Sequence, residues 1–366
     1  MSYYILPKSN NTIYVNPISI ESKIIPKLSL SCTLYHYYNE CIEQIKNTLL
    51  IINDSSYNAV DEVIKIVNPY EYIFSNVPGS NFSVSKLKTN NNIFYDFLEI
   101  SVTLNIFEKF NNMPINTFHI TKNRNDTVEC FEMLREGYND ITLSCDNLDE
   151  EIFQQIFYKK FDFIFFETNE KFSNKYIYNV IQFLILILRN QNNDGTAILK
   201  IHNISFKPIL EILYFLTTLF EKVYVIKPNT SNVTSFDKYI ICKNFICNDD
   251  NKNQNKLNYT KLIHFLKQLG NNYIDSILDF DLPYYFITKL DDMNIIIGQQ
   301  QIEALDQAIS ILKNKNKIDK IEMIKKHNIQ KSINWCEKYK IPYNKFTEKI
   351  NIFLPILKDG DNQIQT

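Results

Sequence analysis

The stretch from Gly195 to Phe245 decides the fold. It reads GTAILKIHN at 195–203, SFKPILEILYFLTTLF at 205–220 and EKVYVIKPNTSNVTSFDKYIICKNF at 221–245. The first part predicts a strand with Lys200 near its carboxyl end, and the second predicts an amphipathic helix of about four turns. The third part predicts two strands, VYVI and KYIIC, joined by a loop rich in Thr, Ser and Asn.

This order of elements predicts an α/β fold. A helical crossover joins parallel strands of one sheet, whereas a short loop joins antiparallel neighbours. The strand at 223–226 is therefore expected to run parallel to the first strand, and the strand at 238–242 to return antiparallel. Further strands are expected at NTFHIT (116–121) and KFDFIFF (160–166). Helices are expected at 91–115, at 126–136 with Asp126 as the N-cap, at 176–190 and at 301–312, with a polar linker at 248–258.

The same stretch resembles the C-terminal half of the FtsJ-like ribose 2′-O-methyltransferases, above all the viral and eukaryotic mRNA-cap enzymes. The matching residues are Gly195, Leu199, Lys200, Phe220 to Val223, Lys227, Pro228, Thr230, Ser231, Tyr239, Ile240, Cys242 and Lys243. The resemblance implies a Rossmann-like S-adenosylmethionine-dependent methyltransferase fold, with a mostly parallel sheet and a final antiparallel strand.

The resemblance also predicts a domain organisation. The expected parts are an N-terminal extension (1–90), an FtsJ-like methyltransferase domain (91–247), a helical C-terminal region (259–346) and a tail (347–366). QKSINWC at 330–336 and IPYN at 341–344 resemble the tails of FtsJ-like proteins in large DNA viruses. This implies a viral protein in the host cytoplasm or in the virion.

Composition excludes several classes of protein. The 366 residues carry a net charge of −2, so the whole chain is not a strongly basic nucleic-acid binder, although a local basic face stays open. Candidate lysines for such a face are Lys313, Lys315, Lys317, Lys320, Lys325 and Lys326. The alternative is that these lysines form a solvated helix face without a partner. Seven cysteines without a C-x-x-C pair indicate free thiols in a reducing compartment. No apolar run has the length of a membrane span, and the N-terminus lacks the pattern of a targeting peptide.

Lys200 is the first candidate catalytic residue. The family uses a lysine–aspartate–lysine–glutamate tetrad, whose central lysine lies near the ribose 2′-oxygen and assists its deprotonation or stabilises the alkoxide. Lys200 lies at the carboxyl end of its strand, where ligand sites of open α/β sheets lie. The alternative is a lysine that reaches solvent from a strand end.

The other tetrad positions are altered. Glu167 occupies the first acidic position and Asp237 occupies the second. The alternative for Asp237 is an aspartate at the start of a strand without a catalytic role. Asp96 stands where the first lysine belongs, which reverses the charge, and Lys86 or Lys88 could substitute from nearby. No P-loop, GxGxxG or metal-ligand spacing supports another Rossmann-like enzyme. The isolated His119, His202 and His327 indicate core or surface roles rather than metal ligation.

The methyl-donor loop departs most from the family. A glycine-rich turn after the first strand lets the backbone approach the donor without an intervening Cβ. No glycine lies between Thr121 and Gly137, and the Pro-Gly turn VPGS at 77–80 is a weak alternative. NDIT at 139–142 resembles a segment that follows the second and third strands of the viral relatives, yet only one short helix separates it from the first strand. The interval with donor and RNA contacts is therefore predicted to be deleted.

These departures favour a catalytically degenerate member of the family, a pseudoenzyme. It is expected to bind RNA, capped mRNA included, or a viral capping or transcription partner, without a membrane or a metal. The alternative is an active RNA 2′-O-methyltransferase with an atypical donor site, and S-adenosylmethionine is the expected cofactor only in that case. A donor cavity that is open, rather than filled by Phe165, Phe166 or Arg124, would favour activity.

Overall fold

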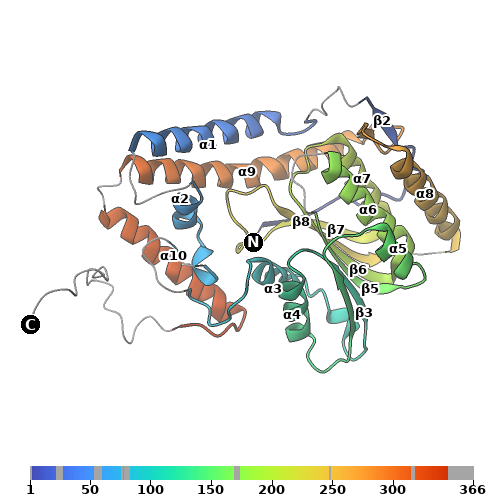
Figure 1. Cartoon of the computed structure of the whole chain (residues 1–366), viewed down its shortest axis with the longest axis horizontal. Coiled ribbons are helices and arrows are strands. Elements are labelled where there is room, and N and C mark those ends of the chain that lie inside the picture. Colours follow the sequence, from blue (N-terminus) through green and yellow to red (C-terminus); the bar gives the residue numbers. More distant parts are fainter. Residues whose placement is uncertain are drawn as a thin grey trace, which may run out of the picture.

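A mixed sheet forms the centre of the molecule. The computed structural model describes residues 2–21, 28–52, 60–75, 77, 83–168, 174–246, 249–314 and 318–344. Within these residues, seven strands form one sheet in the order β1-β7-β8-β6-β5-β3-β4, with helices on both faces (Figure 1). The strands are β1 (Ser2–Ile5), β3 (Asn116–Ile120), β4 (Ile141–Cys145), β5 (Phe161–Glu167), β6 (Gln191–Ile201), β7 (Phe220–Lys227) and β8 (Lys238–Phe245). The tail at 347–366 lies outside the described residues.

The stretch from Gly195 to Phe245 forms β6, α7 (Lys207–Leu219), β7 and β8, as predicted. β8 lies between β6 and β7 and pairs antiparallel with both, so β6 and β7 run parallel without touching. β5 pairs parallel with β6 and β3, and β3 pairs parallel with β4. The prediction of a Rossmann-like methyltransferase fold, mostly parallel with a final antiparallel strand, is confirmed by this topology.

Helices bury both faces of the sheet because its strands alternate between two cores. In β5, Phe166 packs against Phe183 of α6 (Asn174–Asn190), with ring centroids 5.7 Å apart. Phe163 and Phe165 point the other way, toward Phe97 of α3 (Ile93–Thr103). The remaining crossover helices are α4 (Arg124–Leu134) and the short α5 (Glu150–Gln155).

The N-terminal and C-terminal segments pack together around this sheet. β1 pairs antiparallel with β7 at one edge, and β2 (Ile18–Ile20) pairs antiparallel with β9 (Tyr273–Ser276). α1 (Cys32–Ile52) and α9 (Tyr284–Lys313) lie side by side along one side of the molecule (Figure 1). Gly298 permits this approach, since a Cβ there would lie 2.2 Å from a methyl group of Leu34. The other elements are α2 (Val60–Val67), η1 (Glu71–Ile73) and α10 (Ile318–Lys338).

Three predicted elements were wrong in extent or role. α3 ends at Thr103 and is followed by a turn and the short helix η2 (Glu108–Phe110), so 91–115 is not one helix. Asp126 lies inside the first turn of α4, where it accepts a hydrogen bond from the Asn90 backbone, and Asn123 is the N-cap. The predicted linker at 248–258 belongs largely to α8 (Asp249–Gln268), because amides of this helix bind the distant backbone at Ile13.

Candidate functional site

Lys200 and Glu167 meet at the carboxyl edge of the sheet. Glu167 ends β5, Lys200 lies one residue before the end of β6, and the parallel register places them opposite each other. Lys200 Nζ lies 2.8 Å from Glu167 Oε1, and only 15% and 10% of the two side chains are exposed. Two of the three candidate catalytic residues thus form a largely buried ion pair.

The turn after β3 holds the other oxygen of Glu167. Thr121 Oγ1 donates a short hydrogen bond to Glu167 Oε2, and Asn123 Nδ2 donates to the same oxygen at 3.3 Å. The resemblance places the glycine-rich donor loop at this turn. The two side chains of this turn thus hold Glu167 Oε2 at the end of β5.

Asp237, the third candidate, lies immediately before β8 and contacts His202. The distance from Asp237 Oδ1 to His202 Nδ1 is 2.6 Å. Burial would raise the pKa of Asp237, but the hydrogen bond from His202 and the charge of Lys200 hold it well below its usual range. Sequence reasoning missed His202 as a site residue, because an isolated histidine carries no signal of its distant partner.

Asp96 completes the group of tetrad positions. Its buried carboxylate accepts hydrogen bonds from Thr230 Oγ1 at 2.5 Å and from Tyr239 OH at 2.9 Å. Burial raises the pKa of Asp96 to about 6, against the hydrogen bond from Thr230 and the charge of Lys200. Among the described residues, neither Lys86 nor Lys88 substitutes for the missing lysine, since both are exposed and neither contacts Asp96.

Three carboxyl groups therefore act on Lys200. Burial alone would lower the pKa of this lysine, but the charges of Glu167, Asp237 and Asp96 raise it above its ordinary value. Lys200 is protonated at neutral pH, and its ammonium is directed at Glu167. Lys200, Glu167, Asp237 and Asp96 are thus brought together in space, with Lys200 as the one cation among these four residues.

Two further buried lysines flank Asp237. Lys227 Nζ donates to the carbonyl oxygens of Ser235 and Asp237, at 2.6 and 3.0 Å. Burial lowers the pKa of Lys227 to about 8 and that of Lys238 to about 7. The Lys-Pro that ends β7 was visible in the sequence, but its spacing gave no sign that Lys227 binds the 235–237 turn.

α1 and α9 pack on this turn. Gln301 of α9 donates to Ser235 O at 2.6 Å. Tyr35 and Tyr38 of α1 pack against Phe236, with ring centroids 5.5 and 4.5 Å away. The 235–237 turn, which carries Asp237, is therefore held against two helices that lie outside the predicted methyltransferase domain.

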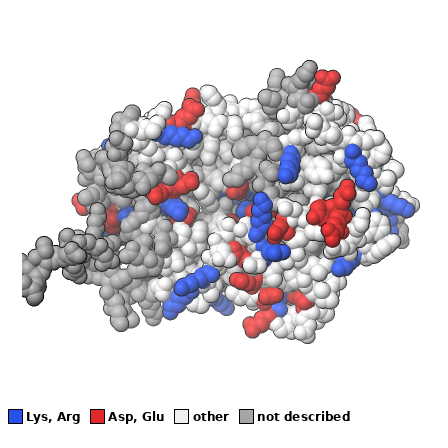
Figure 2. All heavy atoms as spheres, in the orientation of Figure 1, with Lys and Arg blue, Asp and Glu red and all other residues white. Residues whose placement is uncertain are grey.

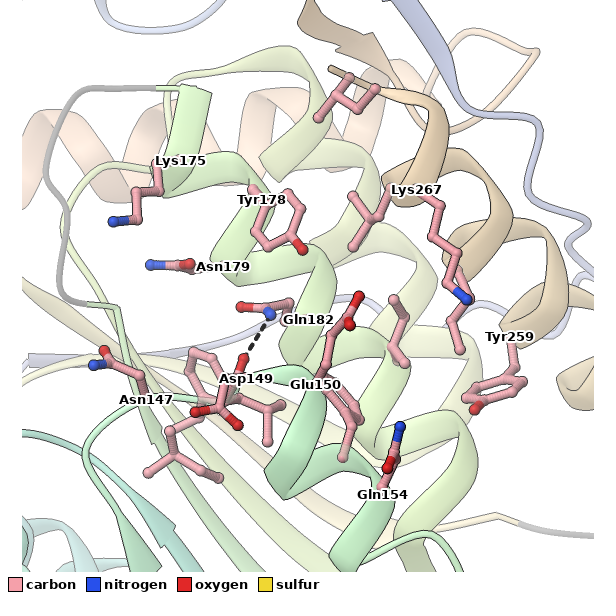
Figure 3. A pocket seen from close by; sticks show the side chains of 18 of the residues that line it. Asn147, Asp149, Glu150, Gln154, Lys175, Tyr178, Asn179, Gln182, Tyr259 and Lys267 are labelled. Carbon is pink, nitrogen blue, oxygen red and sulfur yellow. Dashed lines mark hydrogen bonds between the residues drawn. The ribbon is translucent and has the colours of Figure 1, made fainter. Parts of the chain in front are cut away.

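A cavity of about 1070 Å³ lies beside the cluster (Figure 3). Ile120, Phe166 and Glu167, at the carboxyl ends of β3 and β5, contribute to its wall, and α5, α6 and α8 supply much of the rest. Lys200 and Asp237 do not line it. The polar side chains around it include Asn147, Asp149, Glu150, Gln154, Lys175, Tyr178, Asn179, Gln182, Tyr259 and Lys267, which Figure 3 labels, together with Lys122 and Asn174.

Neither Phe165, Phe166 nor Arg124 fills this cavity. Phe165 lies on the other face of the sheet, where it stacks with His119 in the core. Phe166 forms part of the wall, and Arg124 pairs with Asp146 at 3.5 Å without lining the cavity. Burial lowers the pKa of His119 to about 3, which fits a core histidine. The alternative donor turn at 78–80 lies outside the described residues.

The surface offers no dominant basic area on the face in view. Lys and Arg are interspersed with Asp and Glu there (Figure 2). Of the predicted basic cluster, Lys325 pairs with Glu322 at 3.1 Å, and Lys315 and Lys317 lie outside the described residues. In the described part of the chain, no group of three His, Cys, Asp or Glu could hold a metal ion, and no helix is long and apolar enough to cross a membrane.

Comparisons with known proteins assign no family. No protein-family model matches the chain, and no curated protein matches it. Among solved structures, the chain is similar to phosphoethanolamine N-methyltransferase 2 of Haemonchus contortus in complex with S-adenosyl-L-methionine, at 13% identity and a TM-score of 0.27. The match covers 49% of this chain and 45% of that one. A TM-score this low supports neither a fold nor a function. The fold is therefore inferred from the sheet topology, and the proposed function from the residues of the site.

Proposed function

We propose that the chain is a non-catalytic member of the FtsJ-like ribose 2′-O-methyltransferase family, related to those of large DNA viruses. It would act as a subunit that binds RNA or a protein of mRNA capping or transcription. The surroundings of Lys200 carry the proposal: its ammonium is engaged by Glu167, and Asp96 replaces the second cation of the tetrad.

Electrostatics explains why this cluster would not catalyse the transfer. A ribose 2′-oxygen gains negative charge as it attacks the methyl group, and an enzyme lowers the barrier with positive charge aimed at that oxygen. Two lysines and two acids share the site in the family. An oxygen beside Lys200 would instead lie near an ammonium that is already bound to Glu167. It would also lie near the negative charge of Asp237, and that charge would oppose the reaction.

A binding role is supported by the same helices that pack on the site. α1 and α9 bind the 235–237 turn through Gln301, Tyr35 and Tyr38 and add a long surface beside the sheet. The mixed charge on the face shown in Figure 2 and the net charge of −2 favour a protein partner or local RNA contacts over extended electrostatic binding of RNA.

An active methyltransferase with an atypical donor site is the second candidate, and the large cavity favours it. The cavity lies beyond the carboxyl ends of β3 and β5, where open α/β sheets bind small ligands. Gln182 and Asp149 offer polar groups, and Phe153 and Tyr178 offer ring surfaces that suit a nucleoside. S-adenosylmethionine would be the cofactor of this candidate.

Calorimetric titration of the full chain with S-adenosylmethionine separates the two candidates. The non-catalytic proposal expects no heat of binding at millimolar donor. Binding at micromolar donor would favour the second candidate, and methyl transfer to capped RNA would then be measured. Transfer that Lys200→Ala abolishes without changing the unfolding transition would overturn the proposal, with Lys222→Ala, an exposed lysine of β7, as the matched control.

A further inference from the structure

A second cavity, of about 360 Å³, lies between the β7–β8 loop and helices α9 and α10. Lys227 ends β7, the loop after it supplies Ser231, α9 supplies Gln300 and Gln307, and α10 supplies Lys331. None of these residues lines the large cavity or belongs to the Lys200–Glu167 pair. The second cavity is therefore a separate candidate site.

Lys227 gives this cavity a buried positive charge. Its residue surface is only 7% exposed, and its ammonium donates to Ser235 O and Asp237 O. A lysine ammonium has three N–H donors, so one is left unused by the described residues, none of which forms an ion pair with it. The charges of Asp237 and Asp96 act on Lys227, but burial outweighs them and lowers its pKa to about 8, so an anion in the cavity would compensate the buried cation.

Further donors line the cavity beside Lys227. Ser231 is 3% exposed, and its hydroxyl makes no hydrogen bond within the described part of the chain. The same holds for the side chains of four other lining residues, which are Tyr70, Gln300, Gln307 and Lys331. The acid among the lining residues, Glu303, is exposed and accepts a hydrogen bond from Gln299 at 3.0 Å. The lining thus presents two cations and several free donors against one carboxylate.

We propose that this cavity binds the terminal phosphoryl group of a small molecule, or free phosphate, between Lys227 and Lys331. A phosphoryl group carries more than one negative charge and accepts several hydrogen bonds, which matches two lysines with hydroxyl and amide donors. The volume lies at the lower end of the range for small-molecule sites. The inference does not rest on the proposed function, because its ligand is different, although Lys227 also holds the turn that carries Asp237.

Titration calorimetry of the full chain with pyrophosphate, at constant ionic strength, tests the site. One binding site is expected. Lys331→Gln should weaken binding about tenfold, and Ser231→Ala by about threefold, through lost hydrogen bonds to a charged ligand. Neither substitution removes a hydrogen bond within the described structure, so both variants are expected to fold. Lys320→Gln, on α10 but outside the cavity, should leave the affinity unchanged.

The controls can overturn the assignment. No binding at millimolar pyrophosphate, or an equal loss in Lys320→Gln, would remove the site, because the latter indicates diffuse attraction to surface charge. Dimethyl phosphate, a diester like those of a nucleic-acid backbone, is expected not to compete, since it has only two free oxygens and a single charge. Competition by the diester at equal concentration would contradict a site for terminal phosphoryl groups.

Discussion

The Lys200 cluster and the large cavity share Glu167 but differ in how they are closed. In the cluster, Glu167 and Asp96 are bound by neighbouring side chains, and α1 and α9 pack on the adjacent turn. The cavity keeps about 1070 Å³ of space against the same edge of the sheet. The difference teaches that one edge of a sheet can carry a ligand-sized space and a closed charge cluster side by side, because space depends on the walls and catalysis on particular atoms.

Removing the cation should have the largest effect on the closed region. Lys200→Met leaves the buried carboxylate of Glu167 without its cation, while Asp237 keeps His202 and Lys227, so the free energy of unfolding is expected to fall by about 4 kcal/mol, measured by urea denaturation at pH 7. Adding Glu167→Gln should restore much of this loss, because fewer buried carboxylates then lack a partner. A loss below about 1 kcal/mol would mean that the cluster is solvated rather than closed.

The pH dependence of stability sharpens the same comparison. The pKa of Asp96 is raised from 3.8 to about 6, so the folded chain binds this proton more tightly than the unfolded chain. Asp96 therefore adds stability as the pH falls from about 6 to about 4. The difference in unfolding free energy, wild type minus Asp96→Asn, should grow by about 2 kcal/mol between pH 7 and pH 4. A constant difference would contradict the burial of a titrating carboxyl group.

Filling experiments compare the open cavity directly with the closed core. Leu266→Trp places a larger side chain on the α8 wall of the cavity and is expected to change the unfolding free energy by less than about 1 kcal/mol. Leu213→Trp, in the fully buried part of α7, should destabilise the chain by about 2 kcal/mol through overpacking. Equal losses in denaturant unfolding would show that the cavity is not open.

The smallest expected effect concerns the contact between α9 and the cluster. Gln301→Ala removes a buried hydrogen bond to Ser235 O and should cost about 1 kcal/mol of unfolding free energy. Gln299→Ala, which removes an exposed hydrogen bond to Glu303, is the matched control and should cost less than about 0.5 kcal/mol. Equal values would mean that Gln301 does not hold the turn.

The sequence predicted the β6–β8 half of the fold better than the chain around it. Most residues of α7 and the central residues of β7 and β8 are apolar and buried, so their local patterns agree with their burial. The polar first half of α8 predicts a linker, and this prediction is wrong. Gln254 and Asn258 of that helix bind the backbone at Ile13, which lies more than two hundred residues away in the chain. No local pattern carries such a contact.

The sequence by itself determined the class of the sheet and the place of Lys200 at its carboxyl edge. Each of these depends on residue type and short-range periodicity, which a single segment contains. Only the tertiary structure decided that His202 binds Asp237, that Lys227 holds the turn before β8 and that α8 walls a cavity. These contacts join separate segments, and their geometry depends on how whole elements pack against one another.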